Sequence, residues 1–301
     1  MKAQRIDGKA ISDQIKEEAA LEAQELQRQG ITPCLAVVLV GNDPASMVYV
    51  NNKKKACEKV GILSRSYELP EDTEEKDLLA LVEQLNMDNS VHGVLVQLPL
   101  PPQIDEEKVI LAVDPKKDVD CFHPLNVGLL HTGQKGFLPC TPAGVLELIE
   151  RSGHTIEGKR CVVIGRSHNV GKPTAMLLLQ KNGTVTICHS KTKDLKGICK
   201  EADILVSAVG KLHTVTKDMV KEGAVVIDVG MNRNENGKLC GDVDFDDVCE
   251  VAGAVSPAWW RRTHDRCHAH EKLHHSGKTA ERTVTERISL TCKNVGDILF
   301  L

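Results

Sequence analysis

The chain has 301 residues, of which 41% are hydrophobic, 27% are charged and 3% are aromatic. These fractions match soluble globular proteins, so they exclude a disordered, collagen-like or membrane-spanning chain, and the length suits two domains better than one. A net charge of −4 argues against a nucleic-acid partner and against attraction to a membrane surface. The scarcity of aromatic residues also argues against a base-stacking surface.

The cysteines and the amino terminus bear on location. Eleven cysteines are present without any C-x-x-C pair, so their spacing predicts reduced, buried thiols rather than a zinc site or a disulfide framework. The first residues contain no apolar signal core, and the longest apolar run, 35–40, is too short to cross a bilayer. We therefore expect a cytoplasmic protein, with an organelle left open.

The first part of the chain alternates between helical and strand-like patterns. The predicted elements are a helix over 8–29, a strand over 35–40, a helix over 44–60, a helix over 72–87 and a strand over 91–97. Asp43 and Pro44 fit the start of the third element, and Gly61 fits its end. This order predicts a parallel sheet covered by helices.

A stretch rich in proline and glycine at 136–144 marks a boundary, and a second alternation follows it. Strands are predicted over 160–164, 184–188, 203–208 and 224–229, and a helix over 171–182. The fold class is therefore α/β, with two α/β domains joined near residue 140.

The strand over 160–164 leads into Gly165-Arg-Ser-His-Asn-Val-Gly171. A strand, a glycine turn and a helix in this order are typical of a dinucleotide site, although G-x-S-x-x-x-G departs from G-x-G-x-x-G and a plain turn stays an alternative. The next strand ends without the carboxylate that would hold the ribose of NAD. Ser190 and Lys191 follow it and could, with Arg166, receive a 2′-phosphate, which favours NADP unless they are only solvated loop residues.

Tyr49 and Lys53 lie four residues apart in the helix predicted over 44–60, so they share one face. The core face of this helix is expected to hold Met47, Val50 and Cys57. A lysine amine that is partly desolvated or near other cations can do acid–base work near neutral pH. The alternative is a half-buried tyrosine beside a run of solvated lysines.

Other polar residues are weaker candidates. Gln97 ends the strand over 91–97, at the edge where α/β sheets bind ligands, but a loop could equally satisfy its amide. Asp118 and Asp120 could direct two carboxylates to one side, although such pairs are usually surface residues. The aspartates over 242–247 lack the glycine and glutamate of a calcium loop, so we reject a calcium site there.

Eight ordered segments between about residue 5 and residue 257 carry a resemblance to a known family. They are Val40-Gly-Asn-Asp-Pro-Ala-Ser46, Tyr49-Val-Asn-Asn-Lys53-x-Lys55, Gly93-Val-Leu-Val-Gln-Leu-Pro-Leu-Pro101, Lys117-Asp-Val-Asp120, Phe122-His-Pro-Leu-Asn-Val-Gly128, Pro139-Cys-Thr-Pro142, Gly165-Arg-Ser-x-x-Val-Gly171-x-Pro173 and Asp228-Val-Gly-Met-Asn232. Together they resemble the bifunctional methylenetetrahydrofolate dehydrogenase / methenyltetrahydrofolate cyclohydrolase family.

The resemblance implies a folate-binding catalytic domain over 1–139 and a Rossmann-like NADP-binding domain over 140–257, with an active-site cleft between them. It implies NADP-dependent oxidation of 5,10-methylenetetrahydrofolate to 5,10-methenyltetrahydrofolate, followed by hydrolysis to 10-formyltetrahydrofolate. The partners implied are tetrahydrofolate one-carbon derivatives and a second copy of the chain, as a homodimer.

The resemblance also implies roles for single residues. Lys53 would activate water and manage the proton, Tyr49 would stack on the folate, and Gln97 would tune Lys53. Asp120 would accept hydrogen bonds from the pterin ring. The NADP-binding residues would be Gly165, Arg166, Ser167, Ser190 and the backbone at Met231.

The chain departs from the family in two places. Cys121 replaces a glycine, which adds about 1–3 kcal/mol of strain if that position needs a positive φ. From residue 258 the family continues P-G-G-V-G-P-M-T-V-A-M-L-M, and a back-translation of this chain with chosen codons restores that motif one base later. We therefore expect 258–301 to be a frameshift product, real or a sequencing error. Its clustered histidines and tryptophans are then not a metal site, and activity should be weak or absent.

Two other functions remain open at this stage. One is a different NADP-dependent oxidoreductase that shares only the Rossmann domain, against which Tyr49, Lys53 and Gln97 argue. The other is a non-catalytic dimerising relative, which the altered tail would permit.

Overall fold

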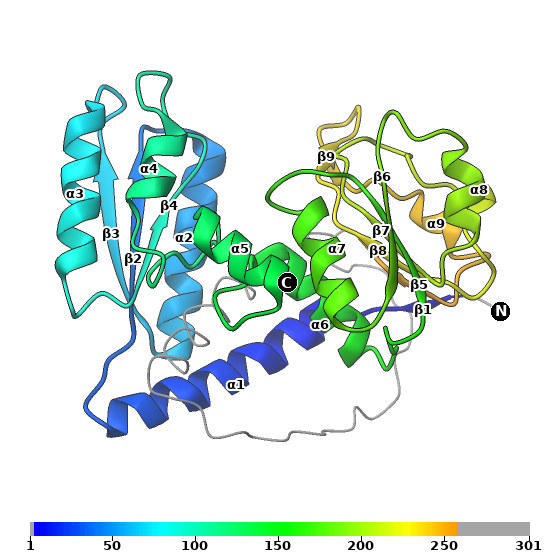
Figure 1. Ribbon diagram of the computed structural model, residues 1–301, viewed down its shortest axis with the longest axis horizontal. Coiled ribbons are helices and arrows are strands. Elements are labelled where there is room, and N and C mark those ends of the chain that lie inside the picture. Colours follow the sequence, from blue (N-terminus) through cyan, green and yellow to red (C-terminus); the bar gives the residue numbers. More distant parts are fainter. Residues whose placement is uncertain (1–2, 258–301) are drawn as a thin grey trace. The chain divides into compact units, whose positions relative to one another are not determined.

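The computed structural model describes residues 3–257, and these form two compact units (Figure 1). The first unit is built from residues 12–140, and the second from residues 3–11 together with 141–257. The long helix α1 (Gly8–Arg28) crosses the division between them. The predicted tail from residue 258 lies outside the described residues.

The first unit contains a parallel sheet in the order β3-β2-β4. Its central strand is buried throughout, as its unbroken apolar run predicts. The edge strand β3 has only exposed and half-buried residues, and several of its side chains are polar. This composition explains why its sequence showed no strand pattern. The strands are β2 (Cys34–Val40), β3 (Leu63–Leu69) and β4 (Gly93–Val96).

Helices of the first unit pack their apolar residues against this sheet. Leu78, Val82 and Leu85 of α3 join a core cluster with residues of the central strand. The helices are α2 (Pro44–Val60), α3 (Glu75–Met87), α4 (Glu106–Ala112) and α5 (Pro124–Thr132).

The second unit contains a six-stranded parallel sheet in the order β1-β11-β8-β7-β5-β6. Strand β5 pairs with the next strand, β6, on one side and with the following strand, β7, on its other side. This reversal creates a switch point at the carboxyl ends of β5 and β7, where open α/β sheets bind ligands. The strands are β1 (Gln4–Arg5), β5 (Arg160–Ile164), β6 (Thr184–Cys188), β7 (Ile204–Ser207), β8 (Val225–Asp228) and β11 (Ala254–Ser256).

Smaller elements complete the second unit. The short antiparallel pair β9 (Asn232–Arg233) and β10 (Leu239–Cys240) follows β8. Its helices are α6 (Cys140–Arg151), α7 (Gly171–Gln180), α8 (Leu195–Lys200), the 3₁₀ turn η1 (Lys217–Met219) and α9 (Phe245–Val248).

Several predicted bounds are confirmed. The helix over 44–60 and the strands over 160–164 and 184–188 have the predicted limits, while the helix predicted from 72 begins at Glu75. The expected assignment of residues 1–139 to one domain differs from the structure in one respect. Residues Gln4–Arg5 pair with β11 and therefore belong to the sheet of the second unit.

All nine cysteines within the described residues are free, and seven of them are buried, in agreement with the predicted reduced thiols. No helix in residues 3–257 is both long enough and apolar enough to cross a membrane. Over the same residues, no group of three or more histidine, cysteine or acidic side chains could hold a metal ion.

Candidate active site

Lys53 is buried in α2, with only 6% of its surface exposed. Local signals place the helix: the Asp43 carboxylate accepts a hydrogen bond from the Ser46 amide at 2.8 Å, and Gly61 ends the helix with φ +78°. A lysine is rarely this buried without a partner. We therefore expect its amine to have a polar partner within the protein.

Gln97 supplies that partner. The Lys53 amine donates to Gln97 Oε1 at 3.3 Å, while Gln97 Nε2 donates to the Leu98 carbonyl at 2.7 Å. The backbone amide of Gln97 also donates to Val38 of the central strand at 2.8 Å. Because Gln97 Nε2 donates to the Leu98 carbonyl, the other amide atom, Oε1, faces Lys53. The Lys53 amine therefore meets an oxygen acceptor rather than a competing N–H.

Tyr49 lies one helical turn before Lys53 on the same face of α2 and is half-buried. Burial raises the pKa of its phenol above the ordinary value, at which the ring is already neutral near pH 7. The expected core face of α2 needs one correction. Val50 and Cys57 are buried as expected, but Met47 is 41% exposed because it lies in the first turn of the helix.

Asp120 belongs to the same group of side chains. Burial raises the pKa of its carboxyl, the positive charge of Lys53 opposes that rise, and the nearby Asp118 adds to it. Lys53 thus bonds to Gln97 and acts electrostatically on Asp120, although the three residues come from α2, the end of β4 and a turn far along the chain.

The turn that carries Asp120 is anchored by its neighbour. The buried Asp118 carboxylate accepts bonds from the amides of Phe122 and His123 at 3.3 and 2.9 Å, and from Asn126 Nδ2 at 2.9 Å. Cys121 within this turn has φ +59°, so the left-handed backbone for which the family uses glycine is present. The Asp118 carboxylate is thus occupied by donors of its own turn.

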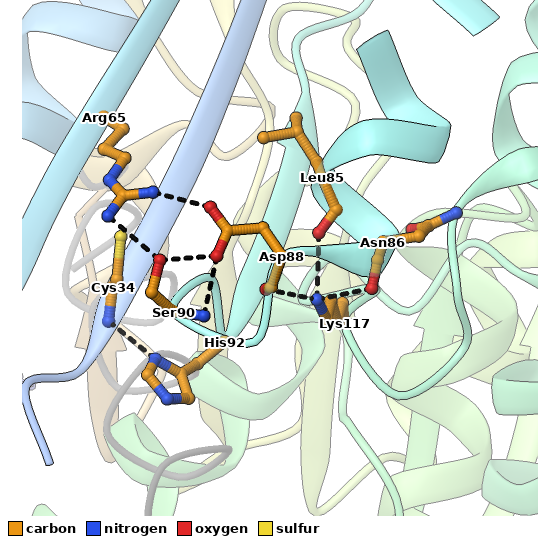
Figure 2. Close-up of polar contacts among 8 residues, drawn as sticks. All are labelled: Cys34, Arg65, Leu85, Asn86, Asp88, Ser90, His92 and Lys117. Atoms are coloured by element: carbon orange, nitrogen blue, oxygen red, sulfur yellow. Dashed lines mark hydrogen bonds and ion pairs between the residues drawn. The ribbon is translucent and has the colours of Figure 1, made fainter. Parts of the chain in front are cut away.

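Lys117 holds the other side of this segment (Figure 2). Its amine donates to the carbonyl oxygens of Leu85, Asn86 and Asp88 at 2.9, 2.7 and 2.8 Å, at the carboxyl end of α3. Its own carbonyl accepts from the Val94 amide of β4 at 2.7 Å. Burial lowers the pKa of this amine. A lysine at the end of a helix satisfies carbonyls that the helix leaves open, so Lys117 ties the turn to both α3 and β4.

The glycine loop of the second unit has the shape of a phosphate cradle. Gly165 ends β5 with φ +122°, and a Cβ there would lie 2.4 Å from the carbonyl oxygen of Ala208. A Cβ on Gly171 would lie 2.3 Å from the carbonyl oxygen of Gly165. Only glycine fits either position, as in loops where backbone must approach a dinucleotide closely. The side chains of Arg166 and Ser167 are exposed on this loop.

The ends of the neighbouring strands complete this edge. Ser190 and Lys191 follow β6 and are exposed, and no carboxylate stands at that strand end. Met231, after β8, is 54% exposed. The predicted cofactor residues therefore follow β5, β6 and β8 of one sheet, all at its carboxyl edge. These features fit NADP better than NAD, because a 2′-phosphate needs cations and hydroxyls rather than an acid.

Comparison with known proteins agrees with this geometry. The family described as "Tetrahydrofolate dehydrogenase/cyclohydrolase, catalytic domain" matches residues 6–120, and "Tetrahydrofolate dehydrogenase/cyclohydrolase, NAD(P)-binding domain" matches residues 139–259. The chain belongs to the tetrahydrofolate dehydrogenase/cyclohydrolase family.

Individual relatives agree. The chain is 60% identical over 255 residues to "Bifunctional protein FolD" of Agathobacter rectalis, covering 85% of this chain and 91% of that one. It is 62% identical over 252 residues to the protein of that name from Lachnoclostridium phytofermentans, covering 84% and 89%.

Two solved structures are also similar. The bifunctional enzyme FolD of Campylobacter jejuni has a TM-score of 0.84 at 42% identity, over 99% of this chain and 98% of that one. The Trypanosoma brucei methylenetetrahydrofolate dehydrogenase-cyclohydrolase, solved with NADP cofactor and inhibitor, has a TM-score of 0.81 at 34% identity, with coverage of 99% and 98%.

Some residues that shape the sites of this tetrahydrofolate dehydrogenase/cyclohydrolase chain were missed by sequence reasoning. Lys117 and Asp228 were noted only as parts of motifs, Asp118 was considered only as one of a carboxylate pair with Asp120, and Asp242 was considered only in a calcium loop that we rejected. Asp228 and Asp242 are buried side chains, with 2% and 0% of their surface exposed. A signal was available, because each lies in the chain beside or near a glycine, as Asp228-Val-Gly230 and Gly241-Asp242.

Proposed function

We propose that the chain is a bifunctional enzyme of one-carbon metabolism, an NADP-dependent methylenetetrahydrofolate dehydrogenase and a methenyltetrahydrofolate cyclohydrolase. The observation that carries this proposal is the buried Lys53 amine, bonded to Gln97 and coupled to Asp120. Both domains of the family are present in the chain. An oxidoreductase that shares only the Rossmann domain would not need the family's catalytic domain, which matches residues 6–120.

In the first reaction, the methylene carbon of 5,10-methylenetetrahydrofolate loses a hydride, and NADP would supply the acceptor for it. The protein's part is to bind and orient. The neutral ring of Tyr49 would stack on the folate, and Asp120 would accept hydrogen bonds from the pterin ring. Burial raises the pKa of the Asp120 carboxyl, and the positive charge of Lys53 opposes that rise and so supports this acceptor role.

In the second reaction, water attacks the methenyl carbon and a carbon–oxygen bond forms. The proton released by the water passes to the Lys53 amine, which acts as the base. The new hydroxyl then loses its own proton as the carbonyl forms, the bond from that carbon to N5 breaks, and N5 takes up a proton to give 10-formyltetrahydrofolate. Gln97 Oε1 accepts a hydrogen bond from the Lys53 amine at 3.3 Å, which fixes the direction in which that amine points. The cationic substrate favours a neutral lysine beside it.

The cofactor residues fit NADP as a group. Gly165 gives the close backbone approach, and the Ser167 hydroxyl accepts from the amides of Val170 and Gly171 at 3.2 and 3.1 Å, which shapes the start of α7. Arg166 and Ser190 are exposed and would hold the phosphates of NADP, and the backbone at Met231 would lie near the nicotinamide. We also propose that the enzyme is a cytoplasmic homodimer, on the strength of the family resemblance.

The test uses purified full chain and, beside it, a chain whose frame is restored from residue 258. Absorbance of 5,10-methenyltetrahydrofolate reports its formation with NADP and its hydrolysis without NADP. We expect both reactions in the restored chain and slower ones in the chain as it stands. Failure of the restored chain to catalyse either reaction would overturn the proposed function. Equal rates in the two chains would overturn the expected damage by the tail.

A variant pair tests the role of Lys53. Lys53→Met should lower cyclohydrolase turnover by about a hundredfold or more, because general-base catalysis contributes that much. Lys54→Met is the matched control, since Lys54 is the next residue on α2 and is exposed. The proposed role is wrong if the two variants hydrolyse the methenyl substrate equally fast.

A further inference from the structure

Asp242 lies just after β10 and is fully buried, and its carboxylate is shared between two loops. Oδ2 accepts from the Ser207 hydroxyl at 3.0 Å and from the Val209 amide at 2.8 Å. Oδ1 accepts from the Lys211 amide at 2.9 Å and from Asn232 Nδ2 at 3.0 Å. The first three donors belong to the end of β7 and the loop after it, and the fourth belongs to the segment after β8.

These two segments lie at the carboxyl edge of the sheet. The Ala208 amide donates to Ile164 at the end of β5 at 2.8 Å, and the Val229 amide donates to Ser207 at 2.8 Å. The carbonyl of Ala208 also packs against Gly165 of the phosphate loop. The segment that Asp242 holds is therefore continuous with the switch point between β5 and β7, where dinucleotides bind.

A second aspartate makes the arrangement reciprocal. The Asp228 carboxylate accepts from the amides of Gly230, Asp242 and Val243 at 3.0, 2.9 and 3.1 Å. A Cβ on Gly230 would lie 2.0 Å from Asp242 Oδ1, and a Cβ on Gly241 would lie 1.7 Å from Asp228 Oδ2. The Asp242 carboxylate fills the space beside Gly230, and the Asp228 carboxylate fills the space beside Gly241. The two segments therefore pack against each other in one register.

The loops held in this way present apolar side chains to solvent. Val209 is 38% exposed in the loop after β7, and Met231 is 54% exposed in the segment after β8. An exposed apolar side chain in each of two rigid loops, at the ligand edge of the sheet, suits the flat and partly apolar ring of a nicotinamide. A buried carboxylate with four donors fixes both loops before any ligand binds.

We infer that Asp242 is a positioning residue for the dehydrogenase half of the proposed function, because it sets the loops after β7 and β8 in the register that receives the nicotinamide end of NADP. This inference rests on that function but goes beyond it, since it separates the two activities. Asp242 serves the unit that binds NADP, whereas the hydrolysis proposed for Lys53 needs no NADP. A change at Asp242 should therefore weaken one activity and spare the other.

The experiment compares Asp242→Asn with Asp244→Asn in the full chain, with or without the restored frame. The asparagine keeps the shape of the side chain but replaces one acceptor oxygen by an N–H that faces other donors. We expect Asp242→Asn to weaken NADPH binding, followed by NADPH fluorescence, by about tenfold and to lower dehydrogenase kcat/KM at least as much. Cyclohydrolase turnover without NADP should stay within about twofold.

Asp244 is the matched control because it lies two residues away and caps α9 through the Asp247 amide. Asp244→Asn should change neither NADPH binding nor either activity. A milder variant, Ser207→Ala, removes one donor while leaving the carboxylate in place, and should weaken NADPH binding by about threefold. It keeps the inference testable if Asp242→Asn does not fold.

Other results would overturn the inference. Unchanged NADPH binding in Asp242→Asn and in Ser207→Ala would do so, as would a parallel loss of both activities in folded Asp242→Asn. These outcomes differ from failure of the proposed function, which would show as a wild-type chain with the restored frame that neither binds NADPH nor hydrolyses the methenyl substrate.

Discussion

The two units each use a buried aspartate to shape a loop, but over very different lengths of chain. Asp118 of the first unit collects donors four to eight residues away, so it closes a single turn. Asp242 of the second unit collects donors 10 to 35 residues away, from the ends of two strands. The hydrogen bonds to Asp118 can form before the sheet is complete, because their donors are close in the sequence. The hydrogen bonds to Asp242 need the sheet to be in place first.

The difference also concerns function. The turn that Asp118 closes carries one side chain, Asp120, whose pKa the charge of Lys53 lowers against the effect of burial. The pair of segments that Asp228 and Asp242 hold instead fixes backbone, because most of their donors are main-chain amides. Acid–base chemistry needs a few placed side chains, while cofactor binding needs a shaped surface, and the two anchors differ accordingly.

We call the Asp228 and Asp242 carboxylates the long-range anchor and Asp118 the local anchor. The largest effect should follow from adding a side-chain atom where a carboxylate of the long-range anchor packs against a glycine. Gly241→Ala puts a Cβ 1.7 Å from Asp228 Oδ2, and neither the buried carboxylate nor the backbone can move freely. We expect a loss of about 3 kcal/mol in the free energy of unfolding, measured in urea. Gly128→Ala in the first unit is the control, because a Cβ there meets nothing within 4 Å. That exposed helical site should gain about 0.5 kcal/mol. Equal effects at the two glycines would mean that the carboxylates do not fix the segments.

A somewhat smaller loss is expected from the local anchor. Asp118→Ala leaves the amides of Phe122 and His123 and the Asn126 side chain without their acceptor, at a cost of about 2 kcal/mol. Asp114→Ala should cost less than about 1 kcal/mol, because that carboxylate holds only the exposed Lys116 amide. Urea unfolding of both variants measures this. If Asp118→Ala unfolds like Asp114→Ala, the turn is held by other contacts.

Sequence patterns predicted the local features of both units and missed the long-range ones. The bounds of α2 could be predicted because Asp43, Pro44 and Gly61 act within a few residues of themselves. The burial of Lys53 could not, since its partner Gln97 is 44 residues away and becomes a neighbour only through the sheet. The role of Asp242 could not be predicted for the same reason, because its partners are distant in the sequence. Its local sequence showed only an aspartate-rich segment that lacks the residues of a calcium loop.

The third prediction uses pH to separate the two anchors. Burial raises the pKa of Asp228 from 3.8 to about 7, and the nearby Asp242 charge adds to the rise against the amides that donate to it. Between these values the folded chain holds a proton that the unfolded chain has lost. Its contribution is therefore complete below about pH 4 and disappears as the pH rises through 7.

We expect the free energy of unfolding to fall by on the order of 1 kcal/mol per pH unit between pH 5 and 7 because of this group. Asp228→Asn, which copies the neutral form, should remove that part of the slope, whereas Asp118→Asn should leave it. Urea unfolding at several pH values measures both. Identical slopes in wild type and Asp228→Asn would show that Asp228 does not carry the pH dependence.

The smallest effect is expected at Cys121, within the turn that Asp118 closes. Its φ of +59° is strained for a cysteine, and glycine would relieve about 1 kcal/mol. Cys121 is also buried, with 2% of its surface exposed, so the change gives up apolar burial and adds freedom to the unfolded chain. These terms oppose each other, and Cys121→Gly should shift the free energy of unfolding by less than about 1 kcal/mol.

Asn182→Gly in the second unit separates the strain from the burial. Asn182 has φ +63° but is exposed, so its replacement relieves strain without a loss of burial. Thermal unfolding of the two variants should place Asn182→Gly at or slightly above wild type and Cys121→Gly at or slightly below it. The reverse order would show that the cysteine strains the turn more than its packing stabilises it. The Asp118 anchor would then be holding Asp120 against a backbone that resists the turn, and tighter folate binding by Cys121→Gly should accompany that result.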